Sequence, residues 1–299
     1  MQNPFGQVIT AMVTPFKSDL SIDYEGTEKL VNHLIKTGTD TIVVAGTTGE
    51  SPTLTYEEER DLCKFVQKIV VKKVKIILGA GSNSTATAIE ATREAEKLGV
   101  DGVLSVVPYY NKPDQRGQIE HFSQIAKSTN LPIILYNIPG RTGVNMEPQT
   151  VAELAIKYKN IMGYKDATGN LDNTSQVIQL TPKEFFVYSG DDSLTLPMLS
   201  IGAVGVISVA SHIVGGEIKD MINSYFTGKI DLAKQVHTKL FPLFKALFKA
   251  PNPTCIKAAL DIKGICKSDL RPPLVKLNEK ELNELKQVIN KTCSELIVK

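Results

Sequence analysis

The sequence predicts an α/β protein in which eight parallel strands and their helices form a (β/α)8 (TIM) barrel, followed by a C-terminal helical appendage. The first observation behind this prediction is a set of eight short apolar segments rich in β-branched residues. Several, such as TIVVA and IILYN, are continuously apolar, as strands covered on both faces are. The second is helical periodicity in the stretches between them. Strands alternating with helices at intervals of roughly 20–35 residues favour parallel βαβ units, and a doubly wound sheet usually has fewer strands.

The expected strands share an apolar run bounded by turn residues. They are Val8–Val13, Thr41–Ala45, Lys75–Gly79, Gly102–Val107, Ile133–Asn137, Ile161–Lys165, Phe185–Ser189 and Gly205–Val209. Between them, Ala88, Ala91, Ala95 and Leu98 follow the spacing of one helix face. The segment Tyr56–Lys72 has glutamates near its start and lysines near its end, which the helix dipole favours.

The chain continues past the eighth expected unit. Three further helices are predicted at Lys229–Lys249, Pro253–Gly264 and Asn278–Lys299, separated by prolines. We therefore expect a barrel over residues 1–228 and a helical region over residues 229–299.

Composition excludes several classes of protein. The chain has 299 residues, 42% of them hydrophobic, and 34 Lys and Arg against 32 Asp and Glu, so its net charge is +2. This balance predicts neither a nucleic-acid footprint nor attraction to anionic membranes. The longest weakly polar run, Leu196–Ala210, is shorter than the roughly 18–20 residues that span a bilayer. Residues 1–16 do not resemble a targeting segment. The four cysteines and four histidines lack the spacing of a disulfide framework or zinc site, which favours a reduced, cytoplasmic, metal-free protein.

Lys165 is the most informative polar residue at a strand end. Reacting groups of such barrels project from the C-terminal ends of the strands. The period of two puts Gly163 on the same face as Lys165, and we expect this glycine to leave room for a substrate. If that face points into the barrel, burial lowers the pKa of the lysine, whose free amine can form a Schiff base with a ketone. The alternative is a lysine that reaches solvent or is neutralised by Asp166.

Side chains at two other strand ends suit the same chemistry. The hydroxyl of Tyr136 can relay protons to an adduct on a nearby lysine. Thr47 and Thr48 lie between glycines and offer hydroxyls and backbone N–H groups to a carboxylate. Arg141 can bind a second carboxylate in a bidentate way. Each of these residues has an alternative interpretation without a catalytic or binding role. For Tyr136 it is a packed tyrosine, for Thr47 and Thr48 a plain turn, and for Arg141 a surface arginine.

Other motifs are weak or absent. Gly79–Ser84 follows an expected strand, and Asp101 lies about 20 residues later, but the third glycine of a dinucleotide site is missing. The sequence has no G-x-x-x-x-G-K-[ST], H-E-x-x-H or G-x-S-x-G motif. Phosphate-binding, zinc and serine-hydrolase functions are therefore not predicted.

Four motifs at successive strand ends resemble those of one family. They are GTTGES at Gly46–Ser51, PYYNKP at Pro108–Pro113, YNIPGRTG at Tyr136–Gly143 and GYKDATG at Gly163–Gly169. The chain resembles the dihydrodipicolinate synthases of the N-acetylneuraminate lyase superfamily, over essentially its whole length. The resemblance implies a lyase that condenses pyruvate with L-aspartate β-semialdehyde, in lysine and diaminopimelate biosynthesis, with no cofactor beyond the covalent Schiff base.

The resemblance also implies a role for each matching residue. Lys165 would form the Schiff base, and Tyr136 would donate and accept protons through Thr47 and through Tyr110 of a neighbouring subunit. In this family a dimer is the minimal complete unit and a tetramer the usual assembly, so the resemblance implies a homotetramer, a dimer of dimers. The remaining substrate-binding residues would be Thr48, Arg141, Gly190 and Ile207.

Two alternatives to the synthase remain. N-acetylneuraminate lyases and 2-keto-3-deoxy sugar acid aldolases share the lysine and tyrosine, but they generally lack the arginine of YNIPGRTG and often carry GSTGE. A non-catalytic barrel that binds a keto acid and regulates a partner would have lost Lys165 or Tyr136, and both are present.

A regulatory site is also implied. Lysine-inhibited relatives bind lysine near residues that match Ser51, Asn83 and Tyr109. Sensitive bacterial enzymes, however, carry a histidine where Glu59 stands and a glutamate where Thr87 stands. Without that glutamate the ammonium of a bound lysine lacks its charge partner, so weak or absent inhibition by lysine is expected.

Overall fold

Eight strands form one closed barrel in which each strand lies beside the next in the sequence, from β1 to β8. The computed structural model describes residues 3–297, apart from the side chains of residues 293 and 295–297. The predicted (β/α)8 fold is confirmed, and the ends of every expected strand agree with the structure to within two residues. The strands are β1 (Val8–Ala11), β2 (Thr41–Val44), β3 (Lys75–Gly79), β4 (Gly102–Val106), β5 (Ile133–Asn137), β6 (Ile161–Asp166), β7 (Phe186–Ser189) and β8 (Gly205–Ser208).

The chain divides into two compact units. The first comprises residues 1–6 and 75–207, and the second comprises residues 7–74 and 208–299. The division between a barrel over residues 1–228 and a helical region over residues 229–299 stays a prediction.

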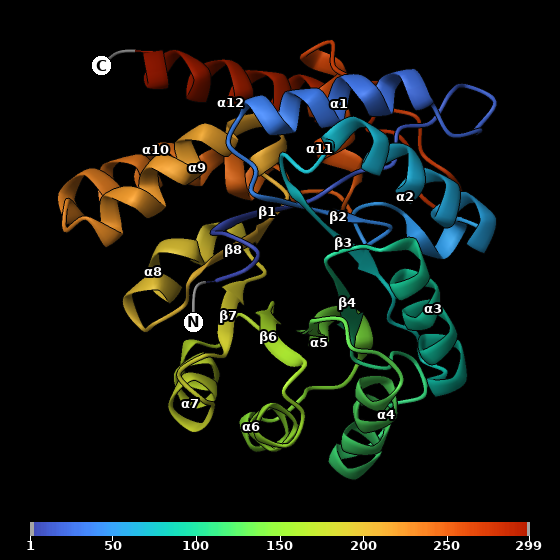
Figure 1. Cartoon of the computed structure of the whole chain (residues 1–299). Coiled ribbons are helices and arrows are strands. Elements are labelled where there is room, and N and C mark those ends of the chain that lie inside the picture. The colour runs from blue at the N-terminus through green and yellow to red at the C-terminus, as the bar shows by residue number, and fades with distance from the viewer. Residues whose placement is uncertain (1–2, 298–299) are drawn as a thin grey trace. The chain divides into compact units, whose positions relative to one another are not determined.

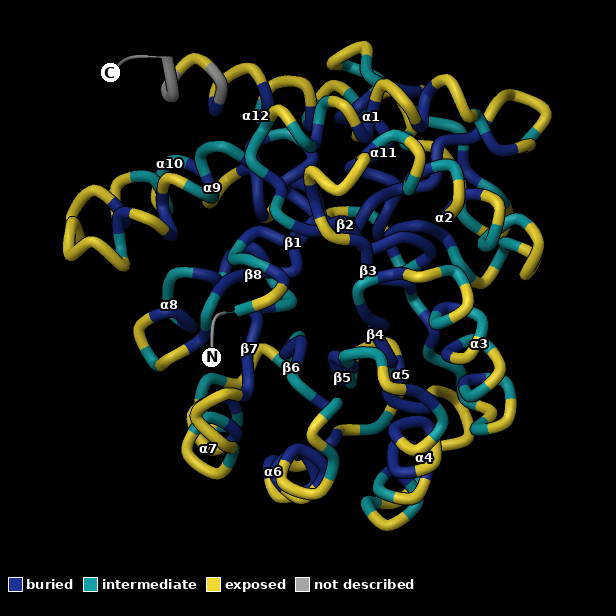
Figure 2. The backbone as a smooth tube through the Cα atoms, in the orientation of Figure 1, coloured by how far each residue is buried: buried dark blue, intermediate teal, exposed yellow. Residues whose placement is uncertain are grey.

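Helices α3, α4, α6 and α7 of the first unit lie on the outer side of strands β3 to β7 in Figure 1. The residues of α3, α6 and α7 that face away from these strands are exposed, whereas the strands are buried (Figure 2). The helical elements are α3 (Thr85–Leu98), α4 (Gln115–Lys127), α5 (Pro139–Thr142), α6 (Pro148–Lys157), α7 (Leu171–Leu180) and α8 (Thr195–Ser200), with a 3-10 turn, η2 (Asp192–Leu194).

Local sequence explains where these helices start and stop. Ser84, Asp114 and Asn170 precede α3, α4 and α7, and the side chain of each accepts a hydrogen bond from the backbone N–H three residues later. Such caps satisfy one of the N–H groups that a helix start leaves without a partner. Gly99 ends α3 with a φ of +69°, a left-handed conformation that costs glycine little.

The second unit contains β1, β2 and the helices from both ends of the chain. Helix α9 packs on β1, and α10 and α11 each contact both α9 and α12. The three predicted C-terminal helices are present as α10, α11 and α12. The helical elements are α1 (Tyr24–Lys36), η1 (Ser51–Thr53), α2 (Tyr56–Val70), α9 (Ser211–Phe226), α10 (Ile230–Ala246), α11 (Thr254–Ile262) and α12 (Glu279–Ile297).

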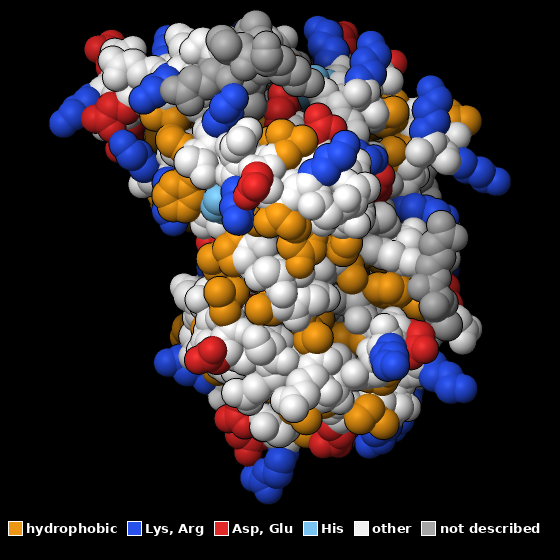
Figure 3. All heavy atoms as spheres, turned by 90° about the vertical axis from the view of Figure 1, so that its left-hand side faces the viewer, with side chains coloured by type: hydrophobic (Ala, Val, Ile, Leu, Met, Phe, Trp, Pro, Cys, Tyr) orange, Lys and Arg blue, Asp and Glu red, His pale blue; other side chains and the backbone are white. Residues whose placement is uncertain are grey.

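The surface mixes charged and hydrophobic side chains. Figure 3 shows hydrophobic side chains among charged ones on one side of the molecule. In and beside α9 and α10, Phe226, Leu232 and Phe241 are exposed, and such exposed apolar residues are common in folded proteins. No helix of the described part of the chain is long and apolar enough to cross a membrane.

The cysteines of the described residues are buried thiols. Cys63, Cys255 and Cys266 are free, and burial raises the pKa of Cys63 to about 12. The side chain of Cys293 lies outside what the structure describes. Among residues 3–297, as far as their side chains are described, no group of three His, Cys, Asp or Glu could hold a metal ion.

Candidate active site

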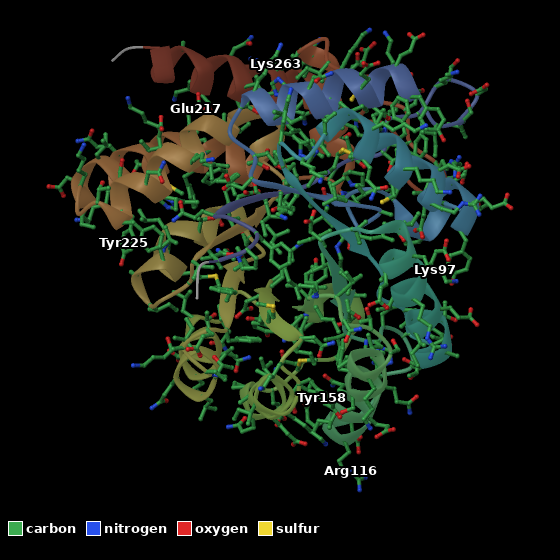
Figure 4. The ribbon with its side chains drawn as sticks, viewed as in Figure 1. Lys97, Arg116, Tyr158, Glu217, Tyr225 and Lys263 are labelled. Carbon is green, nitrogen blue, oxygen red and sulfur yellow. The ribbon has the colours of Figure 1, made fainter. Side chains whose placement is uncertain are left out.

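Lys165 lies near the C-terminal end of β6 with its side chain buried. The residue is only 6% exposed. Burial lowers the pKa of its ammonium to about 8, the charge of Asp192 opposes this decrease, and the charge of Arg141 adds to it. At pH 7 about a tenth of the side chain is therefore a free amine, far more than for an exposed lysine, and this is the form that attacks a carbonyl carbon. By contrast, Arg116 on α4 is exposed and points outward (Figure 4).

Asp166 follows Lys165 directly in the sequence, but it does not neutralise this lysine. Its carboxylate accepts hydrogen bonds from the backbone N–H and hydroxyl of Thr168 and from the hydroxyl of Thr174. The carboxylate that acts on the pKa of Lys165 is instead that of Asp192, in η2 after β7. Asp192 was not among the predicted residues, although the family resemblance placed Gly190, two residues earlier, in the pocket.

Tyr136 on β5 lies beside Lys165. The two strands are parallel, and their register pairs these two residues. The Nζ atom of Lys165 is 4.2 Å from the centroid of the Tyr136 ring, and Tyr136 is 5% exposed. The structure thus brings together the predicted nucleophile and the predicted proton donor. The next residue, Asn137, fixes the end of this strand by donating hydrogen bonds to the hydroxyl of Tyr164 and to Asn145.

The glycines of this region allow close packing. A Cβ at Gly163 would lie 3.0 Å from the carbonyl oxygen of Phe186 and 3.4 Å from Cγ1 of Ile134. The expectation that Gly163 leaves room for a substrate is therefore wrong, because neighbouring strands fill that space. A Cβ at Gly190 would lie 2.7 Å from that of Ala167, so glycine is required where β7 ends beside β6. Ile207, on β8, is 1% exposed.

Arg141 and Tyr110 occupy exposed loops of the first unit. Arg141 lies in the short helix α5, and its positive charge lowers the pKa of Lys165. Tyr110 is 88% exposed and has a φ of +74°, which is uncommon outside glycine. Its backbone N–H donates to the carbonyl of Thr142 at 3.3 Å, so the loop after β4 is tied to α5. Its neighbour Tyr109 is 39% exposed.

Thr47 and Thr48 form a tight turn after β2 in the second unit. The backbone N–H groups of Gly49 and Ser51 both donate to the carbonyl of Gly46, and the N–H of Glu50 donates to the carbonyl of Thr47. Thr47 is half-buried, and Thr48 is 3% exposed. The turn therefore has a fixed backbone and carries hydroxyls that can bind an anion.

Buried polar residues outside the predicted set contact this turn. Asn252, just before α11, donates from Nδ2 to Oγ1 of Thr48 at 2.9 Å. Lys257, within α11, forms a salt bridge of 2.5 Å with Glu50, and both side chains are at most 1% exposed. No local sequence pattern predicts these contacts.

The residues of the predicted lysine site fall into two groups. In the second unit, the hydroxyl of Ser51 donates to Glu59 at 2.6 Å, and burial raises the pKa of Glu59 to about 7. In the first unit, Asn111 donates from Nδ2 to the carbonyl of Asn83 at 2.8 Å, and its backbone N–H donates to the carbonyl of Tyr109. A lysine site formed by these residues stays a prediction.

Comparison with known proteins identifies the family. The chain matches the model of the dihydrodipicolinate synthetase family over residues 4–292. The chain belongs to this family. A relative from a Cyanothece species, named 4-hydroxy-tetrahydrodipicolinate synthase, is 52% identical over 290 residues, which are 96% of this chain and 98% of the relative.

Solved structures of family members have the same fold. The 4-hydroxy-tetrahydrodipicolinate synthase of Methylacidiphilum fumariolicum is 48% identical, with a TM-score of 0.95 over 98% of this chain and 97% of that chain. The DHDPS of Cyanidioschyzon merolae with lysine bound is 47% identical, with a TM-score of 0.93 over 97% of this chain and 98% of that chain. These matches confirm the predicted membership of the dihydrodipicolinate synthetase family.

Proposed function

We propose that this chain is a lyase that condenses pyruvate with L-aspartate β-semialdehyde to 4-hydroxy-tetrahydrodipicolinate, a step of lysine and diaminopimelate biosynthesis. The observation that carries the proposal is the buried Lys165 with a pKa lowered to about 8 and its Nζ 4.2 Å from the centroid of the Tyr136 ring. Relatives about half identical to this chain over nearly their whole length carry the name of this activity.

The proposed chemistry begins with attack of the Lys165 amine on the carbonyl carbon of pyruvate. Loss of water then gives a Schiff base. Removal of a proton from the methyl group gives an enamine, whose carbon attacks the aldehyde of the semialdehyde, and the resulting alkoxide takes up a proton. The amino group of the semialdehyde then attacks the imine carbon and displaces the Lys165 amine, which closes the ring and frees the enzyme. Tyr136 would exchange these protons with the help of Thr47, in a site where Tyr136 is only 5% exposed. No external cofactor takes part in these steps.

Two carboxylates have to be recognised in this reaction. The turn that carries Thr47 and Thr48 supplies hydroxyls for the carboxylate of pyruvate, supported by its fixed backbone. Arg141 would guide the carboxylate of the semialdehyde, supported by its place in the loop after β5 and by its electrostatic influence on Lys165. Gly190 and Ile207 would line the pocket with backbone and apolar surface.

Borohydride reduction in the presence of pyruvate tests the covalent step. The expected result is one pyruvate-derived group per chain, located on Lys165 by peptide mass spectrometry. An adduct on another lysine, or no adduct, would contradict the proposal. Assays of condensation and of N-acetylneuraminate cleavage, run on the same preparation, separate the synthase from the related aldolases. Faster cleavage than condensation would favour the lyase.

We also propose that the chain acts in the cytoplasm as a homotetramer, a dimer of dimers. The support for an assembly is Tyr110, which is 88% exposed in the single chain. If Tyr110 completes a neighbour's site, Tyr110→Phe chains mixed with Lys165→Ala chains should regain activity through hybrids. Verified hybrids without activity would contradict a shared site.

A further inference from the structure

The turn after β2 depends on residues that follow it by about 200 positions. Asn252 lies 204 positions after Thr48, and Nδ2 of Asn252 donates to Oγ1 of Thr48 at 2.9 Å in a buried contact. A threonine hydroxyl has one hydrogen to donate and can accept in addition. Because its oxygen accepts from Asn252, the hydrogen of Thr48 points away from Asn252 and is available to another acceptor.

The backbone of the same turn is strained and is held from the same side. Glu50 has a φ of +58°, a left-handed conformation that non-glycine residues adopt when their surroundings enforce it. Its carboxylate forms the 2.5 Å salt bridge with Lys257 and accepts a hydrogen bond from the backbone N–H of Arg271 at 3.1 Å.

Lys257 is itself fixed by several contacts. Its Nζ donates to the carbonyl of Asp269 at 2.8 Å and lies 4.1 Å from the centroid of the Phe16 ring. These partners compensate for burying an ammonium, which is costly when it is unpaired. Burial lowers the pKa of Lys257, and the charge of Glu50 opposes this. The short contacts of both side chains hold the turn in place.

We infer that α11 and the residues before it position the carboxylate-binding turn: Asn252 directs the hydroxyl hydrogen of Thr48 toward the pyruvate carboxylate, while the Lys257–Glu50 salt bridge holds the backbone in the matching conformation. This inference rests on the proposed function, because it requires Thr48 to receive that carboxylate. Asn252 and Lys257 are positioning residues, since each acts through the turn.

The first experiment measures borohydride trapping on Lys165 against the concentration of two ketones. Pyruvate carries the carboxylate, and hydroxyacetone, of similar size, lacks it. Asn252→Ala should raise the half-saturating pyruvate concentration about tenfold, which corresponds to weakening one charge-assisted hydrogen bond. Asn252→Asp should raise it further, because its carboxylate would accept the Thr48 hydrogen and repel the substrate. Trapping by hydroxyacetone should change less than about twofold in both variants.

A double-mutant cycle separates positioning from a purely structural role. In a Thr48→Val background, Asn252→Ala should have no further effect on the half-saturating pyruvate concentration, because the group that it orients is gone. The inference would be overturned if Asn252→Ala raised the half-saturating pyruvate concentration as much in the Thr48→Val background as in the wild-type protein. It would also be overturned if Asn252→Ala weakened trapping by pyruvate and by hydroxyacetone equally. If the wild-type protein is trapped by pyruvate and Asn252→Ala needs the same pyruvate concentration for half-saturation, the inference is wrong but the proposed function stands. If the wild-type protein is not trapped by pyruvate at all, the proposed function fails, and the inference with it.

A second pair of variants tests the salt bridge. Glu50→Gln combined with Lys257→Met replaces the ion pair by neutral side chains of similar size, which limits the loss of stability. This double variant should need severalfold more pyruvate for half-saturation, with hydroxyacetone trapping unaffected. The matched control is Lys263→Met, at the exposed C-terminal end of α11 (Figure 4), which should match the wild-type protein. Wild-type pyruvate dependence in the folded double variant would remove the salt bridge from the inference.

Discussion

Two buried lysines of this molecule have different surroundings. Lys257 on α11 is fully buried, and its ammonium is surrounded by the carboxylate of Glu50, a carbonyl and an aromatic face. Lys165 on β6 is also buried, but it lies against the ring of Tyr136, and burial lowers its pKa to about 8. Burial lowers the pKa in both cases, so burial alone does not identify a nucleophile.

The difference lies in what surrounds each ammonium. The contacts of Lys257 are short and oppose the decrease in its pKa that burial causes. For Lys165, the nearby charges of Asp192 and Arg141 act in opposite directions, and desolvation decides. Position matters as well: in the proposed reaction the strand end that carries Lys165 meets the substrate, whereas Lys257 lies within α11 and contacts residues of its own unit.

The largest expected effect is that of Lys165→Met on activity. Condensation should fall by about 10³-fold or more, because the nucleophile is lost. Stability should stay the same or increase, because the variant no longer buries an ammonium whose charged form is disfavoured. Assays of condensation together with thermal unfolding check both parts. Activity within tenfold of wild type would show that another group is the nucleophile.

Lys257→Met should behave in the opposite way, with its main effect on stability. Removing one partner leaves Glu50 buried without its counter-charge, which costs about 3–5 kcal/mol. Adding Glu50→Gln should recover most of the free energy of unfolding that the single variant loses. Chemical denaturation of both variants and of Lys263→Met gives the comparison. Equal stability of the single and the double variant would mean that the ion pair does not control the fold of this region.

The pH dependence of Schiff-base formation should sharpen the contrast. Because only the deprotonated amine attacks, the second-order trapping rate should rise with pH and level off above a midpoint of about 8. Asp192 raises the pKa of Lys165, so Asp192→Asn should move the midpoint to lower pH, by about one unit. Arg141 lowers this pKa, so Arg141→Ala should move the midpoint upward. Rates of trapping between pH 6 and 10 (roughly the range over which this amine titrates) test the two signs.

The smallest expected effect concerns inhibition by free lysine. Burial raises the pKa of Glu59 to about 7, so this carboxylate is only partly charged at neutral pH and is a weak partner for an ammonium. Half-inhibition of condensation should therefore require more than about 1 mM lysine, equivalent to about 4 kcal/mol of binding. Titration of activity with lysine measures it. Stronger inhibition would show that Glu59 or another group supplies the missing charge.

Sequence alone was sufficient for the barrel because its signals are local. Continuous apolar runs marked the strands, and the strand-end rule led to Lys165 and Tyr136. The β5–β6 register then placed these two residues side by side.

The supporting residues could not be found in the same way. Asn252 and Thr48 are 204 positions apart, and no local pattern links them. A lysine in a helix is usually a surface residue. One signal was available, because Lys257 stands within a run of buried residues from Thr254 to Leu260 in a segment with few other polar side chains. Gly163 was misjudged because a glycine's neighbours on adjoining strands are invisible in one sequence.

The composition of the second unit has a consequence for synthesis of the chain. This unit joins residues 7–74 to residues 208–299. During translation at about 5–20 residues per second, Asn252 emerges roughly 10 to 40 s after Thr48, from which it is 204 positions distant. Throughout that interval the nascent turn lacks the amide of Asn252 and the ammonium of Lys257 that contact it in the folded chain. The proposed pyruvate-binding turn therefore gains its support only after α11 has been synthesised, and a nascent chain stalled before α11 should carry a turn without that support.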